Sequence, residues 1–226
     1  MSEPFRIVML AYPGMTQLDL TGPFEVFARL PGARIEVVWK SARKPVVDVA
    51  GLAIMPTAAF GDIAGCELLF VPGGPGQLEL MDDAATLDFL RGQGARARYV
   101  TSVCTGSLVL GAAGLLAGYR ATCHWLSLPQ LSLLGAVPVE ERVVVDRNRF
   151  TGAGVSSGID LALAVAAEVA GEEEARRIGL AIEYQPAPAF PPRDREDPRL
   201  VAEVRAKTAA FQLKREEAAR RAGARL

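Results

Sequence analysis

The sequence has a single histidine, His124, and only three cysteines, Cys66, Cys104 and Cys123, among its 226 residues. Zinc sites need several Cys and His ligands at short spacings, and the sequence has no CxxC or HExxH pattern. We therefore expect neither a structural nor a catalytic metal. An odd number of cysteines also argues against the disulfide framework of a secreted protein.

Neither positive nor negative charge predominates. The sequence has 25 Lys and Arg residues and 26 Asp and Glu residues, a net charge of −1. Without a basic surplus, nucleic acid is not expected as a partner. The apolar runs are shorter than the ~18 residues that a membrane span needs. The first ten residues lack the basic and apolar segments of a signal peptide. These absences predict a soluble, cytoplasmic protein, and a hydrophobic content of 50% provides for one well-buried core.

Apolar runs alternate with helical patterns along most of the chain. We expect strands at residues 5–11, 34–40, 52–55, 67–71 and 98–103 and a hairpin of 136–145 with 149–151, and helices at 18–30, 84–97, 107–116, 157–170 and 172–184. This alternation implies an α/β fold, a doubly wound and mostly parallel sheet flanked by helices.

A proline-rich connector follows residue 185 and leads into a charged helix over residues 199–226. We divide the chain into an α/β domain, residues 1–185, and a segment of connector and helix, residues 186–226. The apolar residues of this last helix that offer contacts are Leu200, Val204, Phe211 and Leu213. The helix either packs on its own domain or reaches a second subunit, and we favour a dimer contact.

The most informative segment is YVTSVCTGSLVL, residues 99–110, in which a strand pattern leads into Cys104 and a helix begins at once after Gly106. This is the layout of a nucleophile elbow. Helix N-terminal N–H groups facing the sulfur would favour the thiolate and lower the pKa of Cys104. A buried structural cysteine is the alternative, and Cys66 and Cys123, which lack this setting, fit that alternative better.

Two other segments offer candidates near Cys104, because loops at the carboxyl ends of parallel strands gather around one crevice. Gly73 and Gly74 follow a strand, and their N–H groups either face a ligand or a developing negative charge, or belong to a plain turn. Asp19, at the start of a helix, either caps that helix or reaches the nucleophile with its carboxyl group. His124 is either structural or reaches Cys104 through the fold.

Five segments, LDLTGPFEVF, VPGGPG, SVCTGSLVLGAAGLL, ATCHW and TGAGVSSGIDLAL, resemble in this order the ThiJ/PfpI superfamily, whose fold is glutamine amidotransferase-like, a flavodoxin-like α/β fold. Within it, the chain resembles the homodimeric, cofactor-free branch that adds water to isocyanides to give N-substituted formamides. The resemblance implies a small apolar isocyanide and water as substrates, Cys104 as nucleophile and Asp19 as general acid–base. It also implies that Thr105 and Val155 shape the site.

The sequence differs from the superfamily pattern at two positions, which argues against peptidase, glyoxalase and glutaminase activity. Peptidase and glyoxalase-like members usually carry histidine directly after the nucleophile, where this chain has Thr105, and His124 does not begin the His-x-Glu of glutamine amidotransferases. The LDLTGPFEVF and cysteine segments also occur in the sensor domains of AraC-type transcription regulators. The alternative function is therefore a ligand- or redox-sensing protein without turnover, such as a sensor domain lacking its DNA-binding part.

Overall fold

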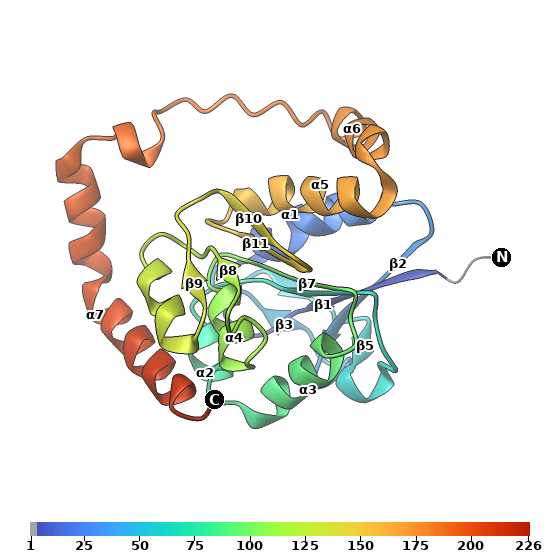
Figure 1. Cartoon of the computed structure of the whole chain (residues 1–226), viewed down its shortest axis with the longest axis horizontal. Coiled ribbons are helices and arrows are strands. Elements are labelled where there is room, and N and C mark those ends of the chain that lie inside the picture. Colours follow the sequence, from blue (N-terminus) through green and yellow to red (C-terminus); the bar gives the residue numbers. More distant parts are fainter. Residues whose placement is uncertain (1–3) are drawn as a thin grey trace.

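The structure is a computed structural model and describes residues 4–226. Its centre is a seven-stranded sheet of order β10-β11-β7-β6-β1-β2-β5, in which the neighbouring strands are parallel except for the antiparallel pair β10–β11. Helices α1, α5 and α6 cover one face, and α2, α3 and α4 cover the other (Figure 1). The predicted doubly wound α/β fold is confirmed.

The elements follow the predicted alternation, with additional short strands. The strands are β1 Phe5–Leu10, β2 Ala33–Trp39, β3 Val46–Val47, β4 Ala53–Ile54, β5 Ala58–Ala59, β6 Leu68–Val71, β7 Tyr99–Val103, β8 Arg120–Ala121, β9 Val137–Pro138, β10 Val143–Asp146 and β11 Arg149–Gly152. The helices are α1 Gln17–Phe27, α2 Gln77–Leu80, α3 Ala84–Gly94, α4 Gly106–Ala112, α5 Ser157–Ala170, α6 Glu172–Ala181 and α7 Pro198–Gly223, with 3-10 helices η1 Phe60–Asp62, η2 Leu128–Leu134 and η3 Arg193–Arg195.

The three central strands place the site. Every residue of β6 and β7 is buried, as are the last four residues of β1, because helices cover both faces of these strands. β6 leads to residues 72–76, called the glycine loop below. β7 leads to Cys104, and β1 leads to the turn before α1. These three connections therefore meet at one edge of the sheet.

Some predicted strands and helix ends are wrong. Residues 52–55 do not join the main sheet, since β4 pairs antiparallel with β3 in a separate two-stranded sheet. Segment 136–145 divides into β9, which pairs with β8, and β10, which forms the predicted hairpin with β11. Helix 107–116 ends at Ala112, and Gly114 follows at φ 76°, a conformation that favours glycine.

The C-terminal helix packs on its own chain in its second half. The connector stands away from the sheet before α7 returns along the opposite side (Figure 1), where α7 contacts η2, α2 and α4. Its buried residues are Arg215, Ala218, Ala219 and Ala222. Of the predicted apolar contacts, Leu200, Val204 and Leu213 are exposed and do not pack on their own domain. A contact of these residues with a second subunit stays a prediction.

Within residues 4–226, no helix is both long enough and apolar enough to span a membrane. The first three residues, which belong to the segment inspected for a signal peptide, lie outside the described residues.

Candidate active site

Cys104 occupies a strained turn between β7 and α4. Its φ of 55° is left-handed, a conformation that few non-glycine residues adopt and that costs about 1–3 kcal/mol. The following helix approaches the neighbouring loop so closely that a Cβ on Gly106 would lie 2.2 Å from the Val71 carbonyl oxygen. The backbone thus has the strand-to-helix turn that the sequence predicts, with Cys104 at its corner.

Asp19 reaches across to this turn from the first turn of α1. Its side chain is completely buried, and Oδ2 accepts a hydrogen bond of 3.0 Å from the Gly73 N–H. The carboxyl group also hydrogen-bonds with the Cys104 thiol. The N-cap residue of α1 is Thr16, so Asp19 does not cap the helix; it is the acidic residue of the first turn, and its carboxyl group binds a distant loop.

Burial raises the pKa of Asp19 to about 7, and the hydrogen bonds from Cys104 and Gly73 offset only part of that effect. The second carboxyl oxygen, Oδ1, is buried and accepts no hydrogen bond of ordinary geometry from the described part of the chain. A carboxyl group that titrates near neutral pH and has an open acceptor atom is suited to proton transfer.

Burial also raises the pKa of Cys104 well above its ordinary value, and the charges of Asp19 and Cys123 raise it further. The Thr105 N–H lowers this pKa, but the effect is smaller. The expectation of a lowered thiol pKa is therefore wrong, because desolvation outweighs the helix terminus. Cys104 and Asp19 titrate as a pair: the first proton leaves Asp19, and the remaining one lies on the Cys104 thiol beside the carboxylate.

The backbone N–H groups of the glycine loop after β6 donate hydrogen bonds to side chains of the site. The Gly74 N–H donates to Thr105 Oγ1 at 3.0 Å, and that hydroxyl donates back to the Gly74 carbonyl at 3.3 Å. The Gly73 N–H is held by Asp19. The predicted role of these two amides, binding a ligand or a developing charge, is thus corrected: they position Asp19 and Thr105.

Glycine is required at both positions of this loop. A Cβ on Gly73 would lie 2.5 Å from the Thr105 nitrogen and 2.8 Å from both Asp19 Oδ2 and Cys104 Cβ. Gly74 has φ 133°, and a Cβ there would lie 2.5 Å or less from the backbone at Met15 and Thr16. Three chain segments therefore meet at distances that only glycine permits.

Two buried residues near the pair are missing from the sequence prediction. Tyr12 lies two residues after the end of β1, and its hydroxyl donates to the Pro72 carbonyl at 3.0 Å. Burial raises the pKa of Tyr12, and the charges of Asp19 and Cys104 raise it further. Arg215 comes from α7 and is only 5% exposed. Tyr12 could have been found from its place at the end of a strand, whereas nothing local distinguishes Arg215 from the other arginines of its helix.

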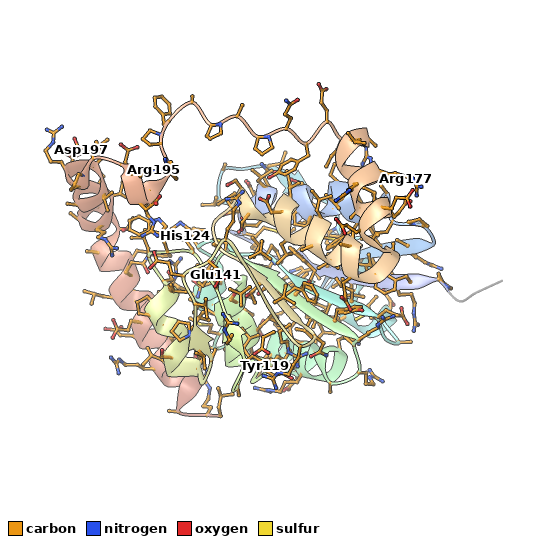
Figure 2. All side chains as sticks on the ribbon, turned by 45° about the horizontal axis from the view of Figure 1, so that its top comes forward. Tyr119, His124, Glu141, Arg177, Arg195 and Asp197 are labelled. Atoms are coloured by element: carbon orange, nitrogen blue, oxygen red, sulfur yellow. The ribbon has the colours of Figure 1, made fainter. Side chains whose placement is uncertain are left out.

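The remaining candidates lie around this centre. Val155 is half-buried in the turn before α5 and packs against the core. His124 lies on the side of the molecule that faces α7 (Figure 2), and its Nδ1 accepts from the Leu126 N–H at 3.4 Å. Burial lowers the pKa of His124, and the charges of Arg215 and Arg193 add to this effect, which favours a structural role for His124.

Burial raises the pKa of Cys66 and of Cys123 to about 12, so both remain thiols.

A cavity of about 980 Å³ lies between the connector, the first half of α7 and the loop that follows β8. Its lining includes Cys123, Trp125, Gly154 and Val204. Cys123 links this cavity to the pair, because its charge raises the pKa of Cys104. Within residues 4–226, no cluster of His, Cys, Asp and Glu has the size needed to hold a metal ion.

Comparisons with known proteins agree with this geometry. The DJ-1/PfpI family matches residues 5–168. An isonitrile hydratase of Pseudomonas putida is 49% identical over 223 residues, 98% of this chain and 97% of its own length. A crystal structure of a ThiJ/PfpI family protein from Pseudomonas syringae superposes with a TM-score of 0.93 at 46% identity, covering 96% of this chain and 90% of that one. The HTH-type regulator GbdR of Pseudomonas aeruginosa is 34% identical over 135 residues, 58% of this chain and 35% of the regulator.

The raised pKa of Asp19 predicts how stability depends on pH. The folded protein holds a proton that the unfolded chain releases between about pH 4 and pH 7. Stability should fall as the pH rises through this interval, by up to about 1.4 kcal/mol per pH unit. Urea unfolding at pH 5 and pH 8 measures the free energy of unfolding of Asp19→Asn and of the wild type. The value for Asp19→Asn minus the value for the wild type should be larger at pH 8 than at pH 5.

Asp48 provides the matched control for this measurement, because its pKa lies below the ordinary value and its titration is complete before pH 5. Asp48→Asn should differ from the wild type equally at both pH values. An equal difference for Asp19→Asn would contradict the raised pKa of that carboxyl.

Proposed function

The chain belongs to the DJ-1/PfpI family, and from that premise we propose that it is an isocyanide hydratase, which adds water to an isocyanide to give an N-substituted formamide. The observation that carries this proposal is the strained Cys104 in contact with the buried Asp19, whose Oδ1 remains open. The hydratase of Pseudomonas putida, whose isonitrile is the same chemical group, supports the substrate class over nearly the whole chain.

The buried pair suits an uncharged, apolar substrate. An isocyanide carbon is electrophilic and carries no hydrogen, so addition requires a nucleophile and a proton at the same atom. Cys104 supplies the nucleophile, and Asp19, with a pKa of about 7, supplies the proton near neutral pH. Neither the isocyanide nor the formamide is charged, so both can reside in a buried site that admits the one water molecule that reacts.

In the first step, the Asp19 carboxylate takes the proton of the Cys104 thiol, which places the proton of the pair on Asp19 and leaves Cys104 as the thiolate. The sulfur attacks the isocyanide carbon while Asp19 delivers its proton to that carbon, giving a thioimidate, S–CH=N–R. Asp19, now ionised, takes a proton from water as the hydroxide attacks the same carbon, and returns this proton to nitrogen. The C–S bond then breaks, the sulfur leaves as thiolate, and the hydroxyl proton passes to Asp19 as the formamide is released.

The other site residues act by position. Gly73 holds the carboxyl group of Asp19, and Gly74 fixes the hydroxyl of Thr105, whose N–H faces the sulfur. Val155, in the turn before α5, would contact the R group of the substrate. No step requires a cofactor or a metal, because the pair supplies both the nucleophile and the proton.

A sensing protein without turnover is the second candidate. The regulator GbdR supports it, but the likeness covers little more than half of this chain. The hydratase covers nearly all of it, including α7. The sensing function is therefore less well supported. All three cysteines are free thiols, which agrees with a reaction in the cytoplasm.

Turnover of a simple isocyanide, such as cyclohexyl isocyanide, with detection of the formamide separates these candidates. Cys104→Ala should abolish turnover, because no other described thiol contacts Asp19, while Cys66→Ala and Cys123→Ala should retain most of it. Turnover by Cys104→Ala at the wild-type rate would refute the nucleophile, and wild-type protein that binds isocyanides without producing formamide would support the sensor.

Asp19→Asn should lose roughly 10²–10⁴-fold in turnover, the usual contribution of a general acid–base. Asparagine keeps an acceptor for the Gly73 N–H, so the fold should persist. Alkylation of Cys104 by iodoacetamide should continue in this variant, which shows that the nucleophile is intact. Normal turnover by Asp19→Asn would leave proton transfer to water or to Thr105.

We further propose that the protein is a homodimer, as the resemblance implies. Leu180 at the end of α6 is 82% exposed and Phe190 in the connector is 78% exposed, and a cavity of about 660 Å³ opens along α6. Exposed apolar groups on one continuous segment mark a surface that a partner covers. Sedimentation at micromolar concentration should give twice 24.1 kDa, and Leu180→Glu with Phe190→Glu should shift the protein towards monomer. A wild-type monomer would contradict the proposal.

A further inference from the structure

Arg215 is a buried cation that has no carboxylate partner among residues 4–226. Its side chain is 5% exposed, and Nε donates to Gln77 Oε1 at 2.6 Å while Nη1 donates to Ser127 Oγ at 2.9 Å. The arginines that follow it form exposed ion pairs: Arg220 and Arg221 of α7 with Glu216 and Asp82, and Arg225, just after α7, with Asp82. Burying a charge against neutral partners is costly, so its balancing charge must be sought nearby.

The position of Arg215 links α7 to the segments that build the site. Gln77 begins α2 directly after the glycine loop, and Ser127 follows the Cys123–His124 segment. α7 also packs against α4, the helix that begins beside Cys104. The guanidinium is therefore fixed at the point where these segments converge, and its charge acts on Cys104, Cys123 and Tyr12.

The charges in this region balance if Arg215 is counted. Tyr12 and Cys123 stay protonated because burial raises their pKa values, and burial keeps His124 neutral by lowering its pKa. Asp19 and Cys104 together hold one proton and thus one negative charge. Burial lowers the pKa of the Arg215 cation, whereas the charges of Cys123, Cys104 and Tyr12 raise it, and its own charge can therefore offset the negative charge of the pair.

We propose that Arg215 of the C-terminal helix is the counter-charge that makes the Cys104 thiolate accessible inside the protein, and so is a positioning residue for the nucleophile. The reaction it serves rests on the proposed function, but thiolate formation can be measured without an isocyanide. The sulfur carries negative charge when it attacks and again when it leaves, and Arg215 favours both states through a field that Gln77 and Ser127 hold in place.

The test is the pH dependence of iodoacetamide alkylation, quantified on the Cys104 peptide by mass spectrometry, because the thiolate is the reactive form. In full-length Arg215→Met, the apparent pKa of Cys104 should rise by about 1 unit or more, so alkylation near neutral pH should slow about tenfold. Arg215→Lys should recover much of the rate. Arg220→Met, on the exposed face of the same helix, should leave the profile unchanged.

A second pair of variants keeps the test decisive if Arg215→Met does not fold. Gln77→Glu places a carboxylate on the Arg215 guanidinium and cancels its field while retaining the tie to α7, so the apparent pKa of Cys104 should again rise. Gln77→Met loses the hydrogen bond but keeps the charge, and should shift the profile much less. A purely structural role predicts the reverse order.

The inference is overturned if Cys104 keeps its wild-type profile in folded Arg215→Met, or in Gln77→Glu where Arg215→Met does not fold. Isocyanide turnover by the wild type is measured separately. A protein without turnover that still shows the shifts would lose the proposed function and keep the counter-charge, while unchanged profiles in an active enzyme would remove only the counter-charge.

Discussion

The site depends on one shared proton that is held away from water. Asp19 and Cys104 are both buried, and each affects the pKa of the other. When one of them is ionised, its charge raises the pKa of the other; when one is protonated, its hydrogen bond favours the ionised form of the other. Burial alone would leave both groups neutral. The arrangement around them, with the Gly73 N–H on the carboxylate and the Thr105 N–H on the sulfur, makes a single negative charge tolerable at either position.

This proton can be shared only because backbone segments from distant parts of the chain approach within van der Waals contact. The parallel strands β1, β6 and β7 deliver these segments to the same edge of the sheet. The glycine loop then removes the side-chain atoms that would separate them. The strain at Cys104 is borne by this surrounding structure.

Local patterns in the sequence were sufficient to predict the elbow at Cys104 and the glycine loop, because each depends on a strand end and the few residues after it. The same patterns left the role of Asp19 open, and only the family resemblance favoured proton transfer. The partners of Gly73 and Gly74 and the direction of the thiol pKa could not be predicted, since both depend on burial and on contacts across 30 or more residues. The strand at β4 was predicted, but its pairing with β3 was not, because two residues carry no periodicity that would indicate a partner. Arg215 was missed because its burial is set by alanines on α7 packing against η2, a tertiary contact without a local signal.

The exposed connector has a consequence for how the chain tolerates being cut. Residues 185–193 are mostly exposed and lie outside the regular elements, which is the kind of segment that proteases nick. A cut there would divide the covalent chain between Cys104 and Arg215 but would leave α7 docked by Ala218, Ala219 and Ala222. The protein would then consist of two complementing fragments. Cys104 would keep its reactivity only as long as the fragment that contains α7 and Arg215 stays bound.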